Sequence, residues 1–176
     1  MSFLCNLTNG SLLGCSAIGG LKTIYIGEYV DGVIVGVDSY DTITGITTTG
    51  LTVYQFQQDI EHGGLNQVLQ ASRENGSVFF ETTLSFKLIE LTDKRRQNLV
   101  ELSRAPLFAI VESNSGQFYY CGLESSGRSS AGTASLGVAL GDLNGVTMDI
   151  MWKSAFGISL MDSNLLGTAI TINPSV

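Results

Sequence analysis

The only histidine, His62, is the side chain whose type best suits acid–base chemistry, because an imidazole gains or loses its proton near neutral pH. Asp59 and Glu61 lie close to it in the sequence. A general base also needs a positioned partner and a sheltered site, whereas the segment around His62 is polar and alternating. We therefore expect no catalytic site and no cofactor, and an enzyme acting through His62 is kept as an alternative.

Other residues with ligand chemistry lack the spacing that a site requires. Asp31, Asp38 and Asp41 are close in sequence, but they do not follow the order of an EF-hand loop, and Asp31 suits a turn. The glycine-containing residues 14–20 lack the Lys and Ser/Thr of a phosphate-binding loop. We predict no metal site, with a structural ion at the aspartates as the alternative.

The three cysteines fit a reducing compartment. Cys5 and Cys15 are ten positions apart, and Cys121 lies in an apolar run. With one histidine and no Cys-x-x-Cys pair, the sequence does not predict a zinc site. Buried free thiols are expected, and a Cys5–Cys15 disulfide stays open as the other possibility.

The composition predicts one domain whose surface meets protein as well as water. The chain has 176 residues, of which 44% are hydrophobic but only 14% charged, against about a quarter in typical domains. A monomer uses charge to keep its surface wet and its strand edges unpaired. A weakly charged monomer rich in Ser, Thr and Gly is the alternative.

Charge and hydropathy argue against tight binding to nucleic acid and against insertion into a membrane. The net charge of −7 argues against affinity for nucleic-acid phosphates, which requires clustered Lys and Arg. No stretch approaches the roughly 20 apolar residues of a membrane helix. Residues 1–20 lack the basic start of a signal peptide, so we expect folding in a cytosol.

Most of the chain alternates between apolar and polar residues, and one segment differs. Residues 92–105 predict an amphipathic helix, with Thr92 as its cap, Asp93 in its first turn and Pro106 after its end. Lys94-Arg95-Arg96 fans around this helix, which favours a solvated face or salt bridges to a neighbouring subunit over nucleic-acid contact. The prediction is a mainly β protein with one flanking α-helix.

Several shorter elements follow from turn residues and composition. Asp31-Gly32 between β-branched runs predicts a hairpin, and residues 107–112 and 117–123 predict strands that pair around a turn. Residues 1–20 resemble an arm that packs on something else. Residues 125–137 are dominated by Ser, Gly and Ala, and we predict a mobile loop that orders on assembly.

A long protruding hairpin is the most unusual expectation. Residues 54–61 and 65–73 alternate, and Asn75-Gly76 turns the chain into the alternating run 77–91. About fifteen residues is far longer than the usual strand of about 5–6, and it would span about 50 Å. Such a ribbon would project beyond a domain of this size unless another subunit supports it.

Copies of this ribbon standing side by side would pair their edges and close into a barrel. The polar face of the ribbon would then line a water-filled channel in which DNA slides without sticking. The candidate channel-lining residues are Gln55, Gln57, Asp59, Glu61 and Gln67. The arm, residues 1–20, and the loop, residues 125–137, are predicted to make contacts between subunits or between rings. The candidate inter-subunit residues are Phe79, Glu81, Lys94, Arg95 and Arg128.

The order of these elements resembles the tail-tube-like proteins of tailed bacteriophages, especially those of Bacteroidetes and related hosts. The likeness is carried by residues 19–26 after the small-residue arm, by residues 81–86, by the helix, by residues 108–116, and by Gly141-Asp142-Leu143-Asn144-Gly145 before a strand. Val146 stands where such families often have an aromatic residue. A neck or connector ring is therefore an alternative to the tube itself.

The resemblance implies a single domain, residues 1–176, with a β-sandwich or half-barrel of the tail-tube type. It implies homo-oligomeric rings, hexamers or multiples, that stack or cap a tail. The rings would contact other tail or neck proteins of the virion and enclose the passing DNA, without a membrane. An alternative from another class is a β-sandwich module that binds carbohydrate or a cell surface, with Tyr119, Tyr120 and Trp152 as stacking platforms.

Overall fold

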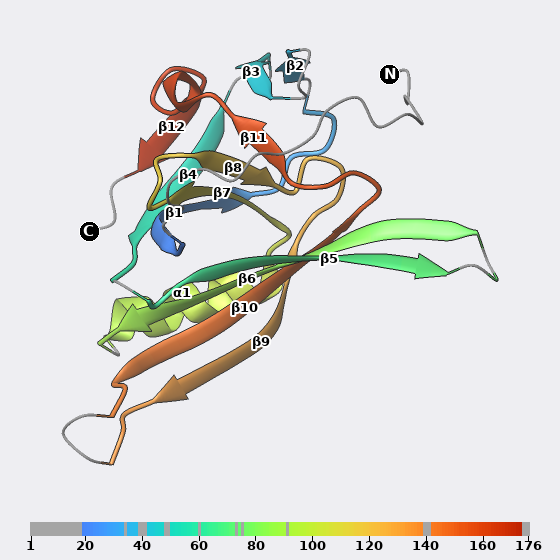
Figure 1. Ribbon diagram of the computed structural model, residues 1–176. Coiled ribbons are helices and arrows are strands. Elements are labelled where there is room, and N and C mark those ends of the chain that lie inside the picture. Colours follow the sequence, from blue (N-terminus) through green and yellow to red (C-terminus); the bar gives the residue numbers. More distant parts are fainter. Residues whose placement is uncertain are drawn as a thin grey trace.

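The computed structural model describes residues 19–33, 35–38, 42–47, 50–59, 61–72, 74, 76–90, 92–138 and 142–173. Within these ranges the protein is mainly β, with one α-helix, as predicted (Figure 1). The strands are β1 (Leu21–Glu28), β2 (Val35–Val37), β3 (Ile43–Ile46), β4 (Leu51–Gln57), β5 (Gly64–Ser72), β6 (Ser77–Ile89), β7 (Leu107–Ser113), β8 (Phe118–Cys121), β9 (Arg128–Ser135), β10 (Gly145–Ser154), β11 (Ser159–Met161) and β12 (Ile170–Asn173). The helix is α1 (Asp93–Arg104), and a 3-10 turn, η1 (Ser163–Leu165), precedes β12. Of the predicted arm, only Gly19 and Gly20 are among the described residues.

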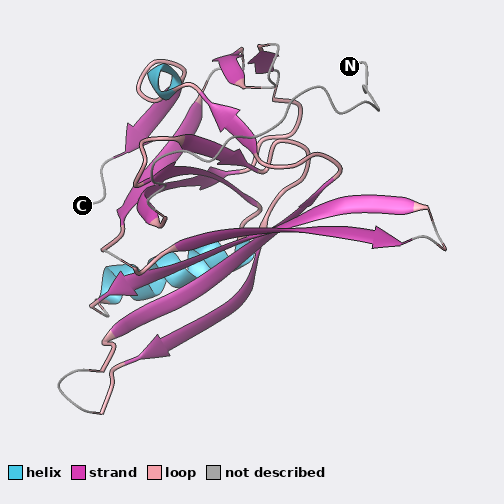
Figure 2. Ribbon diagram, in the orientation of Figure 1, coloured by secondary structure: helices cyan, strands magenta, loops and turns pink. Residues whose placement is uncertain are grey.

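The larger sheet has eight strands in the order β12-β4-β1-β7-β8-β11-β3-β2 and curls into a half-barrel (Figure 2). Its central strands, β1 and β7, are antiparallel and are covered on both faces. In β7, five consecutive residues from Leu107 to Val111 are buried. This explains why its sequence is a continuous apolar run, since a strand covered on both faces has no wet side. The predicted pairing of the 107–112 and 117–123 segments is confirmed as β7 with β8.

The smaller sheet has four antiparallel strands in the order β5-β6-β10-β9. Its longest strand, β6, has 13 residues and pairs with β10 from Ile89–Gly145 to Phe80–Ser154. The pairing of Ser72 with Ser77 confirms the hairpin predicted at Asn75-Gly76. β5 and β6 project beyond the body of the molecule at this end (Figure 1).

Two apolar cores lie on the two faces of the larger sheet. One fills the space between the sheets and receives Ile24, Phe86 and Trp152 from β1, β6 and β10. The other fills the inside of the half-barrel, where Phe108 and Tyr120 stack with ring centroids 5.5 Å apart. Alternation along β1 sends Ile24 to the first core and Tyr25 to the second, so this strand joins both.

The helix closes one side of the space between the sheets. It begins after Thr92, whose carbonyl accepts a hydrogen bond from the Arg96 N–H at 2.9 Å, and it ends before Pro106. Leu99 and Leu102 pack onto the core between the sheets, as the amphipathic pattern predicts. No helix in the described ranges combines the length and apolarity needed to span a bilayer.

The prediction of a mobile loop over residues 125–137 is wrong for most of that segment. Arg128–Ser135 forms β9, which pairs with β10 from Met151–Arg128 to Gly145–Ser135. Its Ser, Gly and Ala side chains supply few apolar anchors, but β10 alongside offers a backbone hydrogen-bonding partner. Pairing with a well-anchored neighbour thus makes a strand from a segment without an apolar pattern.

The predicted Asp31-Gly32 hairpin is also wrong, although the turn exists. Gly32 has a φ of 73°, and its N–H donates to the Asp31 Oδ1 at 2.9 Å. The strands on either side do not pair with each other, since β1 lies between β4 and β7, and β2 pairs with β3. The turn residues make the chain change direction, but they do not determine which strands pair.

Residues 54–61 do not belong to the long hairpin. They begin in β4, which lies between β1 and β12 in the larger sheet, and then turn into β5 of the smaller one. The prediction of one polar ribbon from 54 to 91 is therefore corrected. Apolar and polar residues alternate along β4 because its side chains point to the two faces of the larger sheet.

Candidate assembly surface

The smaller sheet has one face in the core and one face turned away from it. Along β6, Leu84, Phe86 and Leu88 are buried, whereas the residues between them are half-buried and point to the other side. β10 follows the same alternation, with Val146, Met148, Ile150 and Trp152 buried. We call the opposite side the outer face; strand register places on it Asn66, Val68, Gln70, Phe79, Glu81, Thr83, Ser85, Lys87, Thr147, Asp149, Met151, Lys153, Thr133, Ala131 and Arg128.

The outer face is polar and nearly balanced in charge. Its cations are Lys87, Lys153 and Arg128, and its carboxylates are Glu81 and Asp149. Lys153 Nζ lies 3.4 Å from Glu81 Oε2 and 5.8 Å from the centroid of the Phe79 ring. These exposed contacts add little stability, but they neutralise charge on the surface. This surface therefore has no cluster of positively charged side chains, and its electrostatic potential is not of a single sign.

The two edges of the smaller sheet are long and almost uncharged. β5 has nine residues and no charged side chain, and β9 has eight residues with Arg128 as its one charge. In the described structure β5 pairs with β6 alone and β9 with β10 alone, so each has a free edge. Proteins usually protect such edges with charge, proline or short strands. These edges carry little of that protection.

The edges of the larger sheet contrast with them. Its outermost strands, β2 and β12, have three and four residues. Short edge strands offer few backbone groups to another chain. The capacity for pairing between chains is therefore concentrated at β5 and β9.

The structure brings three of the five candidate channel-lining residues, Gln55, Gln57 and Asp59, to one cleft, and places Glu61 and Gln67 outside its lining. Gln55 and Gln57 lie on β4 of the larger sheet, and Asp59 and Glu61 lie in the turn that leads to β5. Glu61 has a φ of 64° there. Gln67 is the only one on the smaller sheet. Its pairing with Thr82 puts it on the core side, where its Nε2 donates to the Thr82 Oγ1 at 3.3 Å.

The candidate inter-subunit residues lie on three elements. Phe79 and Glu81 are on β6, an inner strand, and Arg128 begins the edge strand β9. Lys94 is exposed on the first turn of α1, and the side chain of Arg95 lies outside the described part. The sequence predicted β5 as a strand of the ribbon, residues 65–73, but it did not predict the edge strand β9. The near-absence of charge in residues 128–135 is a signal that could have indicated it.

His62 has no catalytic partner in the described structure. It lies half-buried in the turn before β5, and its Nδ1 is buried without a hydrogen-bond partner among the described residues. Its backbone N–H donates to the Asp59 carbonyl. The Nδ1 atom therefore makes no hydrogen bond to a described residue that could orient the imidazole as a base.

Cys121 is a free, buried thiol, and burial raises its pKa to about 12. A thiol in that environment stays protonated at neutral pH and is a poor nucleophile or metal ligand. Cys5, Cys15 and Asp41 lie outside the described residues. Among the residues that are described, no three His, Cys, Asp or Glu side chains gather as metal ligands would.

The proposed stacking platforms for carbohydrate are largely in the core. Trp152 is 2% exposed, and its Nε1 donates to the Leu107 carbonyl at 2.9 Å. Tyr120 is also 2% exposed, and burial raises its pKa. Only Tyr119 is half-buried. The surface aromatic platform that a sugar-binding site needs is therefore not formed by these three side chains.

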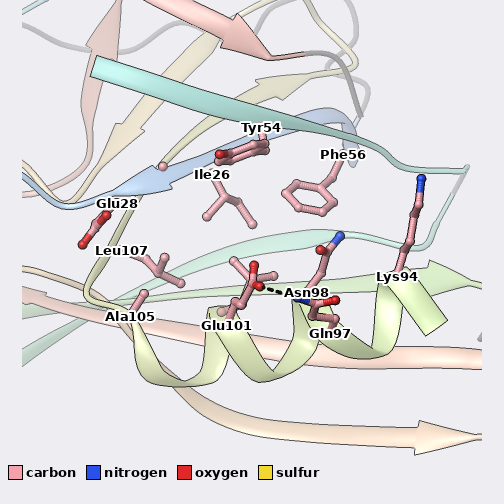
Figure 3. A pocket seen from close by; sticks show the side chains of 12 residues that line it. Ile26, Glu28, Tyr54, Phe56, Lys94, Gln97, Asn98, Glu101, Ala105 and Leu107 are labelled. Carbon is pink, nitrogen blue, oxygen red and sulfur yellow. Dashed lines mark hydrogen bonds between the residues drawn. The ribbon is translucent and has the colours of Figure 1, made fainter. Parts of the chain in front are cut away.

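A cleft of about 530 Å³ separates α1 from β1 and β4 (Figure 3). Its interior is apolar, with Ile26, Phe56 and Leu102, and Tyr54 projects from β4 toward the helix. On the helix side of the cleft, the Gln97 Nε2 donates to the Glu101 Oε1 one turn further along α1, at 3.1 Å. Polar side chains also line this cleft, namely Glu28, Lys94, Gln97, Asn98 and Glu101.

Comparison with known proteins gives no relative: neither a family model, nor a curated protein, nor a solved structure matches the chain. The class that the fold itself defines is a mainly β sandwich with a half-barrel sheet and one flanking helix.

Proposed function

We propose that the protein is a structural subunit that assembles into rings around a DNA passage, as a tail-tube or neck-ring component of a tailed-phage virion. The observation that carries the proposal is the pair of long, nearly uncharged free edges, β5 and β9, on opposite sides of one sheet. Each copy therefore offers two complementary strands to two different neighbours. Contacts of that heterologous kind close into rings when the rotation between copies allows it.

Strand direction supports pairing of β5 with β9 of the next copy. The four strands of the smaller sheet alternate in direction, so its two edges run antiparallel to each other. A neighbour rotated about an axis along the strands would then continue the alternation without interruption. β5 and β9 also have similar lengths, nine and eight residues.

The size of such a ring suits a channel. Four strands spaced by about 4.8 Å contribute about 19 Å of circumference from each copy. The six copies that the resemblance implies would give a barrel of about 24 strands, more than the roughly 16–18 strands that already leave an aqueous channel in porins. The buried face of each smaller sheet packs on the larger sheet of the same copy. The outer face would therefore line the bore.

The chemistry of the outer face suits passage of DNA. Its hydroxyls, amides and balanced charges lack the clustered Lys and Arg that neutralise phosphates. Duplex DNA would meet neither strong attraction nor strong repulsion. This surface replaces the five residues first predicted for the channel.

The test places lysines at the edges. Val68→Lys with Gln70→Lys changes two exposed residues of β5, and Ala131→Lys with Thr133→Lys changes two exposed residues of β9. We expect both variants to fold and to lose ring formation in sedimentation velocity and negative-stain imaging, because charge on an edge opposes pairing. Thr83→Lys with Ser85→Lys, on the same face but on the inner strand β6, is the matched control and should keep the ring. A wild-type protein that stays monomeric at high concentration would contradict the proposal.

A further inference from the structure

The two free edges of the smaller sheet do not lie level with each other. Ala131 of β9 pairs with Asp149 of β10, and Asp149 pairs with Ser85 of β6. Ser85 in turn pairs with Gly64, the first residue of β5. From this common level, β5 extends toward the hairpin turn, whereas residues 131–135 extend toward the opposite end of the sheet (Figure 1). Two copies must therefore shift along the strands to pair the whole of these edges.

The two faces of the sheet restrict this shift to an even number of residues. A shift by one residue would place outer-face residues opposite core-side residues. Ala131 lies on the outer face, as do Gly64 and Val68. A shift of two would leave the end of β9 beyond the start of β5. A shift of four puts Val68 opposite Ala131, and each of residues 131–135 then has a partner on β5.

The shift of four residues also matches side chains across the two edges. It sets Val68 opposite Ala131 on the outer face, and Leu65 opposite Ala134 on the core side. Both are pairs of apolar side chains, and directly opposite residues are the pairs that stabilise a sheet. A shift of six would instead set Val68 opposite the hydroxyl of Thr133.

The same shift gives the strand tilt of a closed barrel. Four residues amount to about 13 Å along the strand, and the four strands of one copy to about 19 Å across it. Repeated from copy to copy, this ratio tilts the strands by about 35° from the barrel axis. Closed barrels have tilts of about 35–45°, because closing a sheet requires such a stagger. The offset built into one chain therefore lies within the range that closure needs.

This register also brings the hairpin of one copy to the helix of the next. Gly132 of β9 lies over α1, since a Cβ there would meet the Leu99 Cδ1 at 3.7 Å. Gln67 would lie opposite Gly132 of the next copy, and Leu69 follows on the same face, about 7 Å nearer the start of that β9. Leu69 is on the core side of its sheet but is 54% exposed, in the part of the hairpin that projects beyond the body (Figure 1).

An exposed apolar residue of α1 lies where Leu69 would arrive. Leu99 faces β9, Leu102 packs on the core, and Glu101 lines the cleft toward β4. With about 100° between successive residues, Val100 lies on the remaining side, next to Leu99 and away from Leu102. It is 41% exposed. A helix face beyond the free edge of β9 is the face that a strand added to this edge would cover.

We propose that β5 of one copy pairs with β9 of the next in this single register, with Val68 opposite Ala131 and Leu69 against Val100 of the next copy. A second copy is the occupant because the edge offset, the apolar cross-strand pairs and the strand tilt all fit β5 to β9 of the same chain type. β5 carries no charged side chain, so the contact buries no charge from it. The inference rests on the proposed ring, and it adds which residues meet in the ring.

A pair of cysteines tests the register. Val68→Cys with Ala131→Cys in one chain should give, after mild oxidation, disulfide-linked ladders up to the full ring on a non-reducing gel. The two positions of one chain cannot bridge, because β6 and β10 keep β5 about 14 Å from β9, whereas a disulfide needs Cα atoms within about 7 Å. Each cysteine variant alone is the control for the natural cysteines and should give no ladder.

Val68→Cys with Thr133→Cys reports the competing register and should give at least about tenfold less ladder. Ladders mainly from this second pair would overturn the proposed register and leave the ring in place. Rings in negative-stain images without ladders from either pair would overturn the pairing of β5 with β9. Linked chains from the first pair without rings would support this contact and contradict the ring, and a protein that forms neither would contradict both.

A charge exchange tests the contact with the helix. Leu69→Lys and Val100→Glu should each raise the protein concentration needed for assembly, measured by sedimentation velocity, at least about tenfold. The two changes in one chain should restore assembly, because the lysine of one copy would meet the glutamate of the next. Val37→Glu, at an exposed apolar residue of β2, is the control and should leave assembly unchanged. Assembly that ignores both single changes would overturn the helix contact.

Discussion

At the scale of single residues, the clearest result concerns Trp152. The sequence left its role open between a core residue and a carbohydrate platform, and burial with a hydrogen bond to Leu107 decides for the core. Gly122 and Gly127 lie directly against the indole, and a Cβ at Gly127 would come within 2.2 Å of the Trp152 Nε1. The ring therefore fits only because glycine leaves room for it.

We expect Gly127→Ala to destabilise the protein by about 1–3 kcal/mol, because the added methyl group overpacks a site where the indole is held by its hydrogen bond. The protein has one tryptophan, so denaturant unfolding can be followed by its fluorescence. Gly45→Ala is the control, since a Cβ there meets nothing within 4 Å. Equal stability of the two variants would show that the indole can move.

At the scale of elements, β9 shows how a strand forms without an apolar pattern. Residues 128–135 contain one charge and no large apolar side chain, yet they pair with β10 along nearly their whole length. The register shifts between Asp149 and Ile150 and leaves residues 131–135 as a regular edge. That edge and the edge of β5 have backbone N–H and C=O groups that point away from the sheet. These groups need a hydrogen-bond partner if they are to be buried.

We expect hydrogen exchange to report this difference. In the monomer about half of the amides of β5 and β9 should exchange quickly, because an edge strand bonds its neighbour with alternate N–H groups. On assembly the remaining amides should become protected. The short edge strand β2 of the larger sheet serves as an internal reference and should not change. Unchanged exchange at β5 and β9 in assembled protein would exclude edge pairing.

At the scale of the whole molecule, the body and the smaller sheet have different roles. The larger sheet holds the smaller one from one side through the core between them, and α1 closes one side of that space. The sheet extends beyond this support, with the β5–β6 hairpin at one end and the end of the β9–β10 pair at the other (Figure 1). In the proposed ring, the long edge strands β5 and β9 would carry the lateral contacts between copies.

Mixing the two edge variants tests the lateral direction. The Val68→Lys, Gln70→Lys protein keeps a free β9, and the Ala131→Lys, Thr133→Lys protein keeps a free β5. We expect a mixture to form one-to-one dimers and nothing larger laterally, because the two unmodified edges pair and the two modified edges stop growth. Light scattering after size-exclusion chromatography would measure the mass. If each variant dimerised alone to the same extent, pairing between unlike edges would be wrong.

The sequence by itself determined the local structure: the single helix beginning after Thr92, the long strand β6, the turn into it at Asn75-Gly76, and a surface poor in charge. Only the tertiary structure decided which strands are neighbours. In the structure, residues 54–57 belong to the larger sheet, Gln67 lies on the core side of the smaller sheet, and residues 128–135 form an edge strand. The physical reason lies in what a two-residue period encodes. It fixes the face of the sheet to which each side chain of a strand points. It does not encode which distant strands pair through backbone hydrogen bonds.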